Sequence, residues 1–322
     1  MSQTSIPAPS QVCVIVPSYC SWENLERNLP GLLGESARVG FDVMISDDAS
    51  PDDTVARLRE HFPDLRVEER AQNGGFGENC NDGVRRAEGY ELIYLLNADV
   101  AVREGFLEPL LEHFDDPDMF ATASVSVAED GVTVEDGARR ASFKRGHLRW
   151  EVNLEAPATG STWPTFFASG AHVLYRRDRF LELGGFDSLY APFYWEDVDL
   201  SYRALKRGWR VLVDHSSKVH HQREHSDIER TQTSSRFVGM NHRGRFLFTW
   251  KNIHDRSLLF GDHLSRILPR ALFGWLMLDR LFYNGFLRAL PRLPRALAGR
   301  HRERTCRVRG DREIFEELER AW

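Results

Sequence analysis

Three acidic residues within four positions form a group that could do acid–base chemistry. Glu196, Asp197 and Asp199 follow the aromatic pair Tyr194 and Trp195. Carboxylates packed this closely are costly unless they are solvated, paired or used, and burial or mutual repulsion raises their pKa. A carboxylate of this kind can act as a general base that removes a proton from a hydroxyl group. The alternative is a helix start, where one or two of the acids interact with the helix dipole.

A second group consists of Asn97 and Asp99, which follow an apolar run. Alternate residues of an extended strand point the same way, so both oxygen-bearing side chains would face one place. Carboxylate and amide oxygens, together with diphosphate oxygens, suit Mg²⁺ or Mn²⁺. A simple Asn-x-Asp turn is the alternative. The pair His220 and His221 could add an imidazole ligand, although such pairs are more often surface or core features.

Polar residues also follow the first two apolar runs. Asp47 could accept a hydrogen bond from a uracil or thymine imide or from a ribose hydroxyl, and Pro17 and Tyr19 end the first run. The segment around Asp47 is equally good turn and capping chemistry. The Gly-rich stretch 73–77, with Asn81 beyond it, would let the backbone approach a ligand near a helix N-terminus. A tight turn is the alternative there.

The elements that must position these residues are predicted by the hydrophobic pattern. Apolar runs at 12–19, 41–50 and 90–100 alternate with helix-like segments at 23–33, 54–61 and 78–88. Strands buried on both faces and spaced by helices predict an α/β fold with a mainly parallel sheet. Ligands of such sheets bind beyond the carboxyl ends of the strands, where the acids and amides above fall.

The rest of the chain is less regular. Hairpins or an excursion from the sheet are expected within 120–165, then a loop, strand, helix and turn within 163–187. A helix and a strand ending near Val213 are expected within 194–213. From residue 233 onward the chain is predicted to be helical, with segments divided by Pro269, Pro291 and Pro294.

Composition bounds the partners and the location. The net charge of −6 gives no hint of nucleic-acid binding, but residues 263–310 contain eleven Arg and only two acids. That segment mixes Arg with Leu, Ile, Phe and Trp, so it could contact an anionic membrane surface, or equally form a helical bundle or a dimer contact. Charges at 279, 280 and 288 argue against a spanning helix. Four cysteines without a CxxC pair, and no visible signal peptide, predict a cytoplasmic protein, with peripheral attachment to the cytoplasmic face of the membrane as an option.

Taken together, these motifs resemble glycosyltransferase family 2 over about residues 11–228. The most specific part is Gly184-Gly-Phe-Asp187, followed by Glu196-Asp-Val-Asp-Leu-Ser-Tyr-Arg203 and Gly208-Trp209. This form is similar to bacterial members that build cell-envelope glycans, including rhamnosyltransferases. The resemblance implies a GT-A fold at 1–230, with a nucleotide-binding part at about 11–100 and an acceptor-binding part at about 101–230. Residues 231–322 would form a helical, Arg-rich extension.

The resemblance also implies roles for single residues. The nucleoside part of the donor would contact Pro17, Tyr19, Asp47 and Asn81. The diphosphate and a Mg²⁺ or Mn²⁺ ion would be held by Asn97, Asp99 and His221, with His220 as runner-up. Asn97 occupies the first position of the family's DxD motif, where Asp would be the stronger ligand. Asp197 would be the general base, with Glu196 as runner-up, and Gly170 and Asp199 would contact the acceptor or support the site.

The expected function is therefore inverting transfer of a single sugar from a dTDP- or UDP-linked donor, with rhamnose as a candidate, to a hydroxyl of a glycan or lipid-linked glycan. The Q-x-x-R-W motif of processive synthases is absent, which favours single addition. A sugar nucleotidyltransferase would carry a Gly-rich basic loop directly after the first strand, where this chain has Pro-Ser-Tyr-Cys-Ser. A non-catalytic nucleotide-sugar binding module is suggested only by Asn97.

Overall fold

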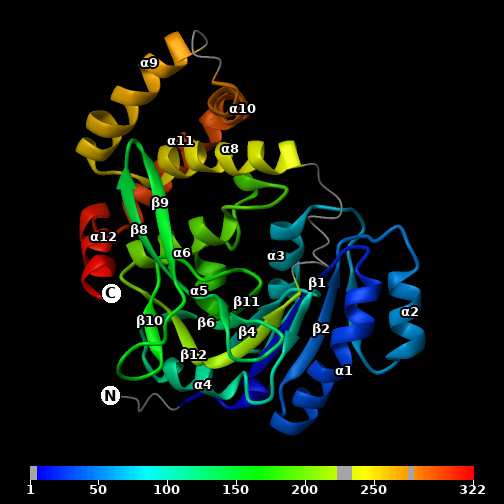
Figure 1. Ribbon diagram of the computed structural model, residues 1–322. Coiled ribbons are helices and arrows are strands. Elements are labelled where there is room, and N and C mark those ends of the chain that lie inside the picture. Colours follow the sequence, from blue (N-terminus) through cyan, green and yellow to red (C-terminus); the bar gives the residue numbers. More distant parts are fainter. Residues whose placement is uncertain (1–5, 223–233, 275–278) are drawn as a thin grey trace.

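Strands and helices alternate through the first hundred residues, as the apolar runs predict. The computed structural model describes residues 6–222, 234–274 and 279–322 (Figure 1). A short 3₁₀ turn, η1 (Pro9–Gln11), comes first. The elements that follow are β1 (Val12–Ser18), α1 (Trp22–Val39), β2 (Asp42–Asp47), α2 (Thr54–His61), β3 (Arg66–Glu69), α3 (Phe76–Arg86) and β4 (Leu92–Leu96). β1 lies between β2 and β4, and β2 pairs with β3, all in parallel.

The second part of the chain completes one ten-stranded sheet in the order β10-β12-β6-β11-β4-β1-β2-β3, with β5 and β7 pairing at its side. β11 is antiparallel to both β4 and β6, whereas β6 and β12 are parallel. The elements are β5 (Val100–Val102), α4 (Glu108–Leu111), η2 (Glu112–Asp115), β6 (Met119–Val127), β7 (Val134–Asp136), β10 (Thr162–Pro164), β11 (His172–Arg176), α5 (Arg177–Glu182), η3 (Ser188–Tyr190), α6 (Glu196–Lys206) and β12 (Arg210–His221). The mainly parallel α/β sheet is confirmed.

Two expectations about this region are wrong. β6 is a fully buried strand of the main sheet, although irregular structure was expected from residue 120. β12 does not end near Val213 but continues to His221, and its second part pairs with β5. The expected hairpin does form slightly later, as β8 (Ala138–Lys144) and β9 (His147–Asn153), which make a separate two-stranded sheet.

The sheet is covered on both faces. Along β1, Cys13 and Ile15 pack into one buried apolar cluster, whereas Val12, Val14 and Val16 pack into the other, which includes residues of α1. Fully burying one such side chain stabilises the fold by about 1.5–3 kcal/mol. This two-sided burial explains why β1 reads as a continuous apolar run, and it fixes the strand ends that carry the candidate site.

The C-terminal part is helical, as predicted, and most of its helices lie across one end of the molecule (Figure 1). It comprises α8 (Ser234–Asn252), the π-helical η5 (Ser257–Leu264), α9 (Ser265–Phe273), α10 (Arg280–Ala289), η7 (Leu290–Arg292), α11 (Leu293–Cys306) and α12 (Asp311–Arg320). Pro269 does not divide two helices, because it lies inside α9. Its missing N–H would pair with Ser265, at the η5–α9 junction where regular pairing is already interrupted.

Among the described residues, no helix has both the length and the apolar character needed to cross a membrane. The proposed domain boundary near residue 230 lies outside the described residues, so it stays a prediction.

Candidate active site

The end of β2 is held by its own turn. Asp47 accepts hydrogen bonds from the Ser50 backbone N–H (2.8 Å) and the Ser50 hydroxyl (2.6 Å), and that hydroxyl accepts from the Cys20 N–H (2.9 Å). The Ser50 turn thereby links the ends of β1 and β2. Pro17 is buried inside β1, whereas Tyr19 just beyond it is 41% exposed. Of these residues, Tyr19 is the one whose ring is open to a ligand.

Asp48, the residue after Asp47, connects the Gly-rich loop to the end of β2. Its carboxylate accepts from the backbone N–H groups of Gly74 (2.9 Å) and Gly75 (2.8 Å) and from Arg70 (2.6 Å). Gly75 has φ +83°, and a Cβ there would lie 3.1 Å from the Pro192 carbonyl oxygen. A glycine is therefore required both by the left-handed backbone and by the close approach of the loop to the segment before α6.

Asn81 has a role that the sequence did not reveal. Its amide donates to the Phe186 carbonyl (2.9 Å), and its Oδ1 accepts from the Phe186 N–H (2.9 Å). The residue therefore ties α3 to the Gly184–Asp187 segment, 105 positions away in sequence. Because both the oxygen and the nitrogen of its amide form hydrogen bonds, Asn81 connects these two segments. A partner so distant in sequence cannot be predicted from a local pattern.

Asp99 and His221 lie close together, two residues after Asn97 and at the end of β12, respectively. β12 reaches β5, where His221 pairs with Val100, and His221 Nε2 lies 3.4 Å from Asp99 Oδ2. Asn97 Oδ1 and Asp99 Oδ1 are buried atoms that find no hydrogen-bond partner among the described residues. Buried oxygens normally have hydrogen-bond partners, so these two oxygens without described partners indicate that a ligand binds here.

These residues fit a divalent cation. Two unsatisfied oxygens and one imidazole nitrogen are the donor types that Mg²⁺ or Mn²⁺ accepts. Within the described ranges, no three His, Cys, Asp or Glu side chains are grouped so as to hold a metal ion. The protein would thus supply only part of the coordination sphere, and diphosphate oxygens would complete it.

His172 is a neighbour that sequence reasoning missed. It lies on β11, fully buried, with its ring centroid 6.4 Å from that of His221. Neither of its ring nitrogens has a hydrogen-bond partner in the described part of the chain. Burial lowers the pKa of His172 to about 4, so the ring is neutral at neutral pH. The apolar strand around it gave no sign of this environment.

The start of α6 carries the acidic cluster on a strained backbone. Tyr194 and Trp195 have φ values of +71° and +81°, which are unfavourable for residues with bulky side chains. Strain of this kind costs on the order of 1–3 kcal/mol per residue and is often found at functional sites. In this protein the strained backbone sets the direction in which the side chains of Glu196 and Asp197 project from the first turn of α6.

Asp197 is linked to the Asn97 region through two adjacent residues. Asp197 Oδ2 accepts from the Gly170 N–H (3.3 Å), and the Ala171 carbonyl accepts from the Asn97 N–H (2.9 Å). A Cβ on Gly170 would lie 3.6 Å from the Asp197 Cβ and 3.6 Å from the Phe76 ring. The Gly170–Ala171 dipeptide therefore joins the two predicted groups, so that Asp197 and Asn97 belong to one site.

Glu196 and Asp197 both hold protons more tightly than ordinary carboxyls. Burial, followed by the neighbouring Asp197, raises the pKa of Glu196 to about 8. Glu196 is 7% exposed, and its Oε2 has no hydrogen-bond partner among the described residues. Burial also raises the pKa of Asp197. Asp197 remains partly exposed, so it is the better placed of the two to meet a substrate.

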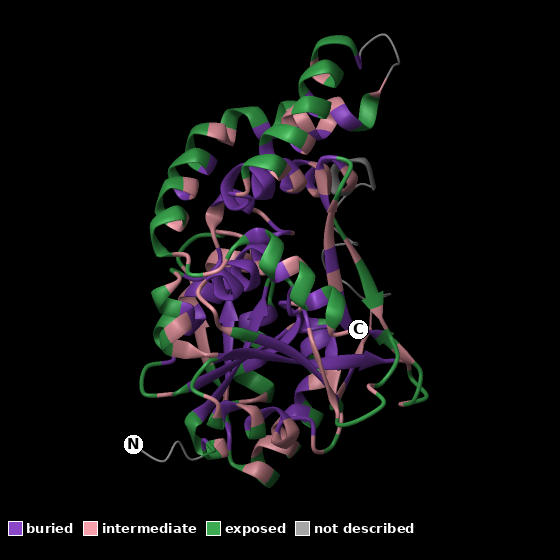
Figure 2. Ribbon diagram, turned by 90° about the vertical axis from the view of Figure 1, so that its left-hand side faces the viewer, coloured by how far each residue is buried: buried purple, intermediate pink, exposed green. Residues whose placement is uncertain are grey.

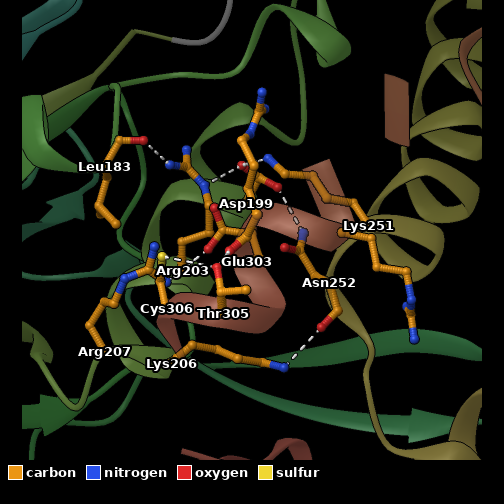
Figure 3. A network of polar contacts seen from close by, with 12 residues as sticks. Leu183, Asp199, Arg203, Lys206, Arg207, Lys251, Asn252, Glu303, Thr305 and Cys306 are labelled. Carbon is orange, nitrogen blue, oxygen red and sulfur yellow. Dashed lines mark hydrogen bonds and ion pairs between the residues drawn. The ribbon is translucent and has the colours of Figure 1, made fainter. Parts of the chain in front are cut away.

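Asp199 differs sharply from Glu196 and Asp197. Figure 3 shows Asp199 beside Arg203, Lys251 and Asn252. It is fully buried and accepts from Tyr190 (2.9 Å), Arg203 (2.7 Å), Lys251 (2.8 Å) and Asn252 (2.7 Å). Burial alone would raise its pKa, but Lys251 and Arg203 hold the pKa of Asp199 well below its usual range. The lowered pKa favours the charged form, and the carboxylate already accepts from the four donors named above, so its position favours a supporting role.

An α/β sheet with a Gly-rich loop, two buried oxygens after β4 that have no partner among the described residues, and a carboxylate linked to them are together typical of nucleotide-sugar glycosyltransferases with the GT-A fold. The family model described as glycosyl transferase family 2 matches residues 13–184. That is more than half of the chain, and the chain belongs to this family.

Relatives agree with this assignment. The N-acetylglucosaminyl-diphospho-decaprenol L-rhamnosyltransferase of Mycobacterium tuberculosis is 27% identical over 236 residues, covering 66% of this chain and 76% of that protein. A mannosyltransferase of Pyrobaculum calidifontis in complex with GDP-Man and Mn²⁺ has a TM-score of 0.53 at 18% identity, covering 93% and 87% of the two chains. S. aureus TarS in complex with UDP-GlcNAc has a TM-score of 0.56 at 18% identity, covering 96% and 90%. The solved structures support the fold.

Proposed function

We propose that this glycosyltransferase transfers one sugar, with inversion, from a dTDP- or UDP-linked donor to a hydroxyl of a lipid-linked glycan in bacterial cell-envelope synthesis. Rhamnose is the candidate sugar, because the mycobacterial relative is named as a rhamnosyltransferase acting on a diphospho-decaprenol sugar. The observation that carries the proposal is the Gly170–Ala171 connection between Asp197 and Asn97.

Asp197 is proposed as the general base. An acceptor hydroxyl is a poor nucleophile, and a positioned base that takes its proton during attack contributes about 10²–10⁴-fold. The hydroxyl oxygen bonds to the anomeric carbon, the bond from that carbon to the diphosphate oxygen breaks, and the proton passes to Asp197. Attack from the face opposite the leaving diphosphate inverts the anomeric centre. The raised pKa of Asp197 suits this role because it strengthens the base.

The donor would lie along the strand ends. Tyr19 would contact the nucleoside directly, with Pro17 and Asp47 shaping the pocket behind it and Asn81 fixing its far wall. Residues 11–100 would thus form the nucleotide-binding part, and 101–230 the acceptor-binding part.

Asn97, Asp99 and His221 would hold Mg²⁺ or Mn²⁺ at the diphosphate. The ion would supply positive charge against the leaving group. Its protein ligands are the orphaned oxygens of Asn97 and Asp99 and the nearby His221 ring.

The C-terminal helices are proposed to contact the cytoplasmic face of an anionic membrane. α9 is largely exposed and α10 has one exposed side (Figure 2), and α9 carries large apolar side chains that include Leu272 (64% exposed) and Phe273 (61%). Leu268, Leu281 and Leu287 are also exposed, and arginines lie between them. Apolar residues interspersed with cations are typical of surfaces that bind anionic lipid. Such a surface would bring the site to a lipid-linked acceptor.

The test is a donor screen followed by matched carboxylate variants. Purified protein is incubated with dTDP-, UDP- and GDP-sugars and a polyprenyl diphosphate-linked acceptor, and product anomers are assigned by NMR. Asp197→Asn is expected to lower turnover about 10²-fold or more while leaving donor affinity intact. Glu196→Gln and the exposed Glu155→Gln serve as neighbouring and distant controls. A product that retains the donor configuration would overturn the mechanism, and a dead Glu196→Gln beside an active Asp197→Asn would overturn the assignment of the base.

A further inference from the structure

Three arginines contact the segment that leads into α6, and a fourth lies near one of them. Arg243 donates to the Tyr190 carbonyl, Arg292 to the Ala191 carbonyl (3.3 Å) and Arg295 to the Ser188 hydroxyl (2.8 Å). They come from α8, η7 and α11, respectively. The fourth, Arg288, lies on α10 and donates to Asn284 of the same helix (2.6 Å). It is near enough to Arg243 to lower the pKa of Arg243 by charge repulsion.

None of these four arginines takes part in any ion pair between residues that the structure describes. Arg243 is 4% exposed, and its Nε has no hydrogen-bond partner there. Burial, together with repulsion from Arg292 and Arg288, lowers the pKa of Arg243 to about 10, although Glu196 acts in the opposite direction. The pKa of Glu196 is itself raised to about 8, so at neutral pH this carboxyl is mostly protonated and supplies little negative charge. Buried charges are normally paired, so an unpaired guanidinium next to other cations indicates a missing anion.

The location identifies the kind of anion. The donor diphosphate is proposed at Asn97 and Asp99, whereas the arginines lie on residues 188–191, just before Glu196 and on the side of the C-terminal helices. Exposed Leu287 and Leu290 flank Arg288. A molecule with a phosphate between a sugar and a lipid chain would place its phosphate on the arginines and its first isoprene or alkyl units on the leucines.

We infer that Arg243, Arg288, Arg292 and Arg295 bind the phosphate or diphosphate that joins the lipid to the acceptor sugar. This inference rests on the proposed function, because it names the residues that would bind the lipid-linked acceptor of the same site. Arginine suits it because the guanidinium fork matches phosphate oxygens in bidentate pairs. Held there, the acceptor hydroxyl would be directed toward Asp197, so the four arginines are positioning residues.

The first experiment needs no turnover. Binding of inorganic pyrophosphate is measured by calorimetry in EDTA, which keeps a metal-dependent donor site out of the measurement. Arg292→Gln and Arg243→Lys are compared with Arg59→Gln, an exposed arginine of α2 that pairs with Glu69. The cluster variants are expected to bind about tenfold more weakly, equivalent to the loss of one charge-assisted contact. Unchanged affinity in both cluster variants would overturn the inference.

The second experiment separates the sources of phosphate. KM is measured for a polyprenyl diphosphate-linked acceptor, for a phosphate-free glycoside and for the donor. Arg292→Gln should raise the KM for the polyprenyl diphosphate-linked acceptor by about tenfold and leave the other two KM values unchanged. A rise in donor KM alone, or loss of binding to phosphatidylglycerol vesicles with acceptor KM unchanged, would assign the arginines to the donor or to lipid headgroups and overturn the inference. Arg-dependent pyrophosphate binding without transfer to any lipid-linked acceptor would support the anion site and overturn only the proposed reaction.

Discussion

At the scale of single residues, the three acids of α6 show how neighbours with the same chemistry acquire different properties. Asp199 faces inward onto Lys251 and Arg203 and stays charged, whereas Glu196 is buried without a donor on its Oε2. Asp197 lies between these extremes, partly exposed and held by the Gly170 N–H. Environment, not residue type, therefore separates a supporting carboxylate from a candidate base.

Glu196 should make stability depend on pH. Its folded pKa of about 8 lies above the ordinary value of 4.5, so its contribution to stability is fully present below about pH 4.5 and is lost as the pH rises from there through 8. Glu196→Gln removes the buried charge, so we expect the variant to be more stable than wild type by on the order of 2 kcal/mol near pH 9. Near pH 5 the two should differ little. Urea unfolding at both pH values measures this, and an equal difference at both would show that the titration of Glu196 plays no part.

Asp99 and Asn97 should respond oppositely to substitution. Asp99→Ala is expected to weaken Mn²⁺ binding and to lower transfer by orders of magnitude, because it removes the charged oxygen ligand. Asn97→Asp should tighten Mn²⁺ binding, because it replaces an amide oxygen with a carboxylate. Electron paramagnetic resonance of free Mn²⁺ in the presence of nucleotide diphosphate measures affinity independently of turnover. Full activity in EDTA, with metal removal verified, would rule out the metal requirement.

At the scale of elements, α6 owes its position to α8. Lys251 binds both Asp199 (2.8 Å) and Asp187 (2.7 Å), and Asn252 adds a further contact to Asp199 (2.7 Å). One end of α8 thereby joins the Gly-Gly-Phe-Asp turn to the helix that carries the candidate base. The Arg-rich extension therefore helps to position the site. This conclusion depends on contacts between residues that are about 50 positions apart in sequence.

Lys251→Met should destabilise the protein strongly. The substitution leaves Asp199 with less compensation in a fully buried position, and breaking a buried ion pair costs about 3–5 kcal/mol. Lys144→Met, at an exposed position of β8, changes the same side chain and should cost less than about 0.5 kcal/mol. Denaturant midpoints compare the two. Similar midpoints for both variants would mean that the Asp199 network contributes little to folding.

The sequence predicted those elements whose burial leaves a simple pattern. β1, β4 and the centre of β2 are apolar, so the alternation of these strands with helices could be predicted. The sequence did not predict β6 or the second part of β12, because these strands bury small polar residues that form hydrogen bonds with one another. Ser124 contacts the Tyr94 hydroxyl (2.8 Å) and the Ser217 hydroxyl (2.7 Å). Such residues resemble exposed positions until their distant partners are known.

The same distinction holds for the candidate site. Asn97, Asp99 and Asp197 could be selected because each ends an apolar run or belongs to a dense motif. The bond of Asn81 to Phe186 and the orphaned ring of His172 depend on packing between distant segments, which no local pattern encodes.

At the scale of the whole molecule, charge and apolar exposure are distributed unevenly. The chain carries a net charge of −6, yet its C-terminal helices combine many arginines with exposed leucines and phenylalanines. Two arginines of this region, Arg292 and Arg295, reach back to the segment before α6. The proposed membrane surface and the proposed acceptor site therefore share helices, so that binding to the membrane would also orient the active site toward a lipid-linked acceptor.

The membrane surface can be tested without assaying transfer. Replacing Leu272, Phe273, Leu281 and Leu287 together by Ser should lower partitioning onto phosphatidylglycerol vesicles at least about tenfold, because each buried apolar side chain favours the interface. These residues are exposed, so thermal stability should stay near that of wild type. Leu154→Ser, at an exposed apolar position after β9, is the matched control. Binding of wild type should weaken as salt screens the arginines. Absence of vesicle flotation at low salt, or equal flotation of the fourfold variant and wild type, would show that this face does not contact the membrane.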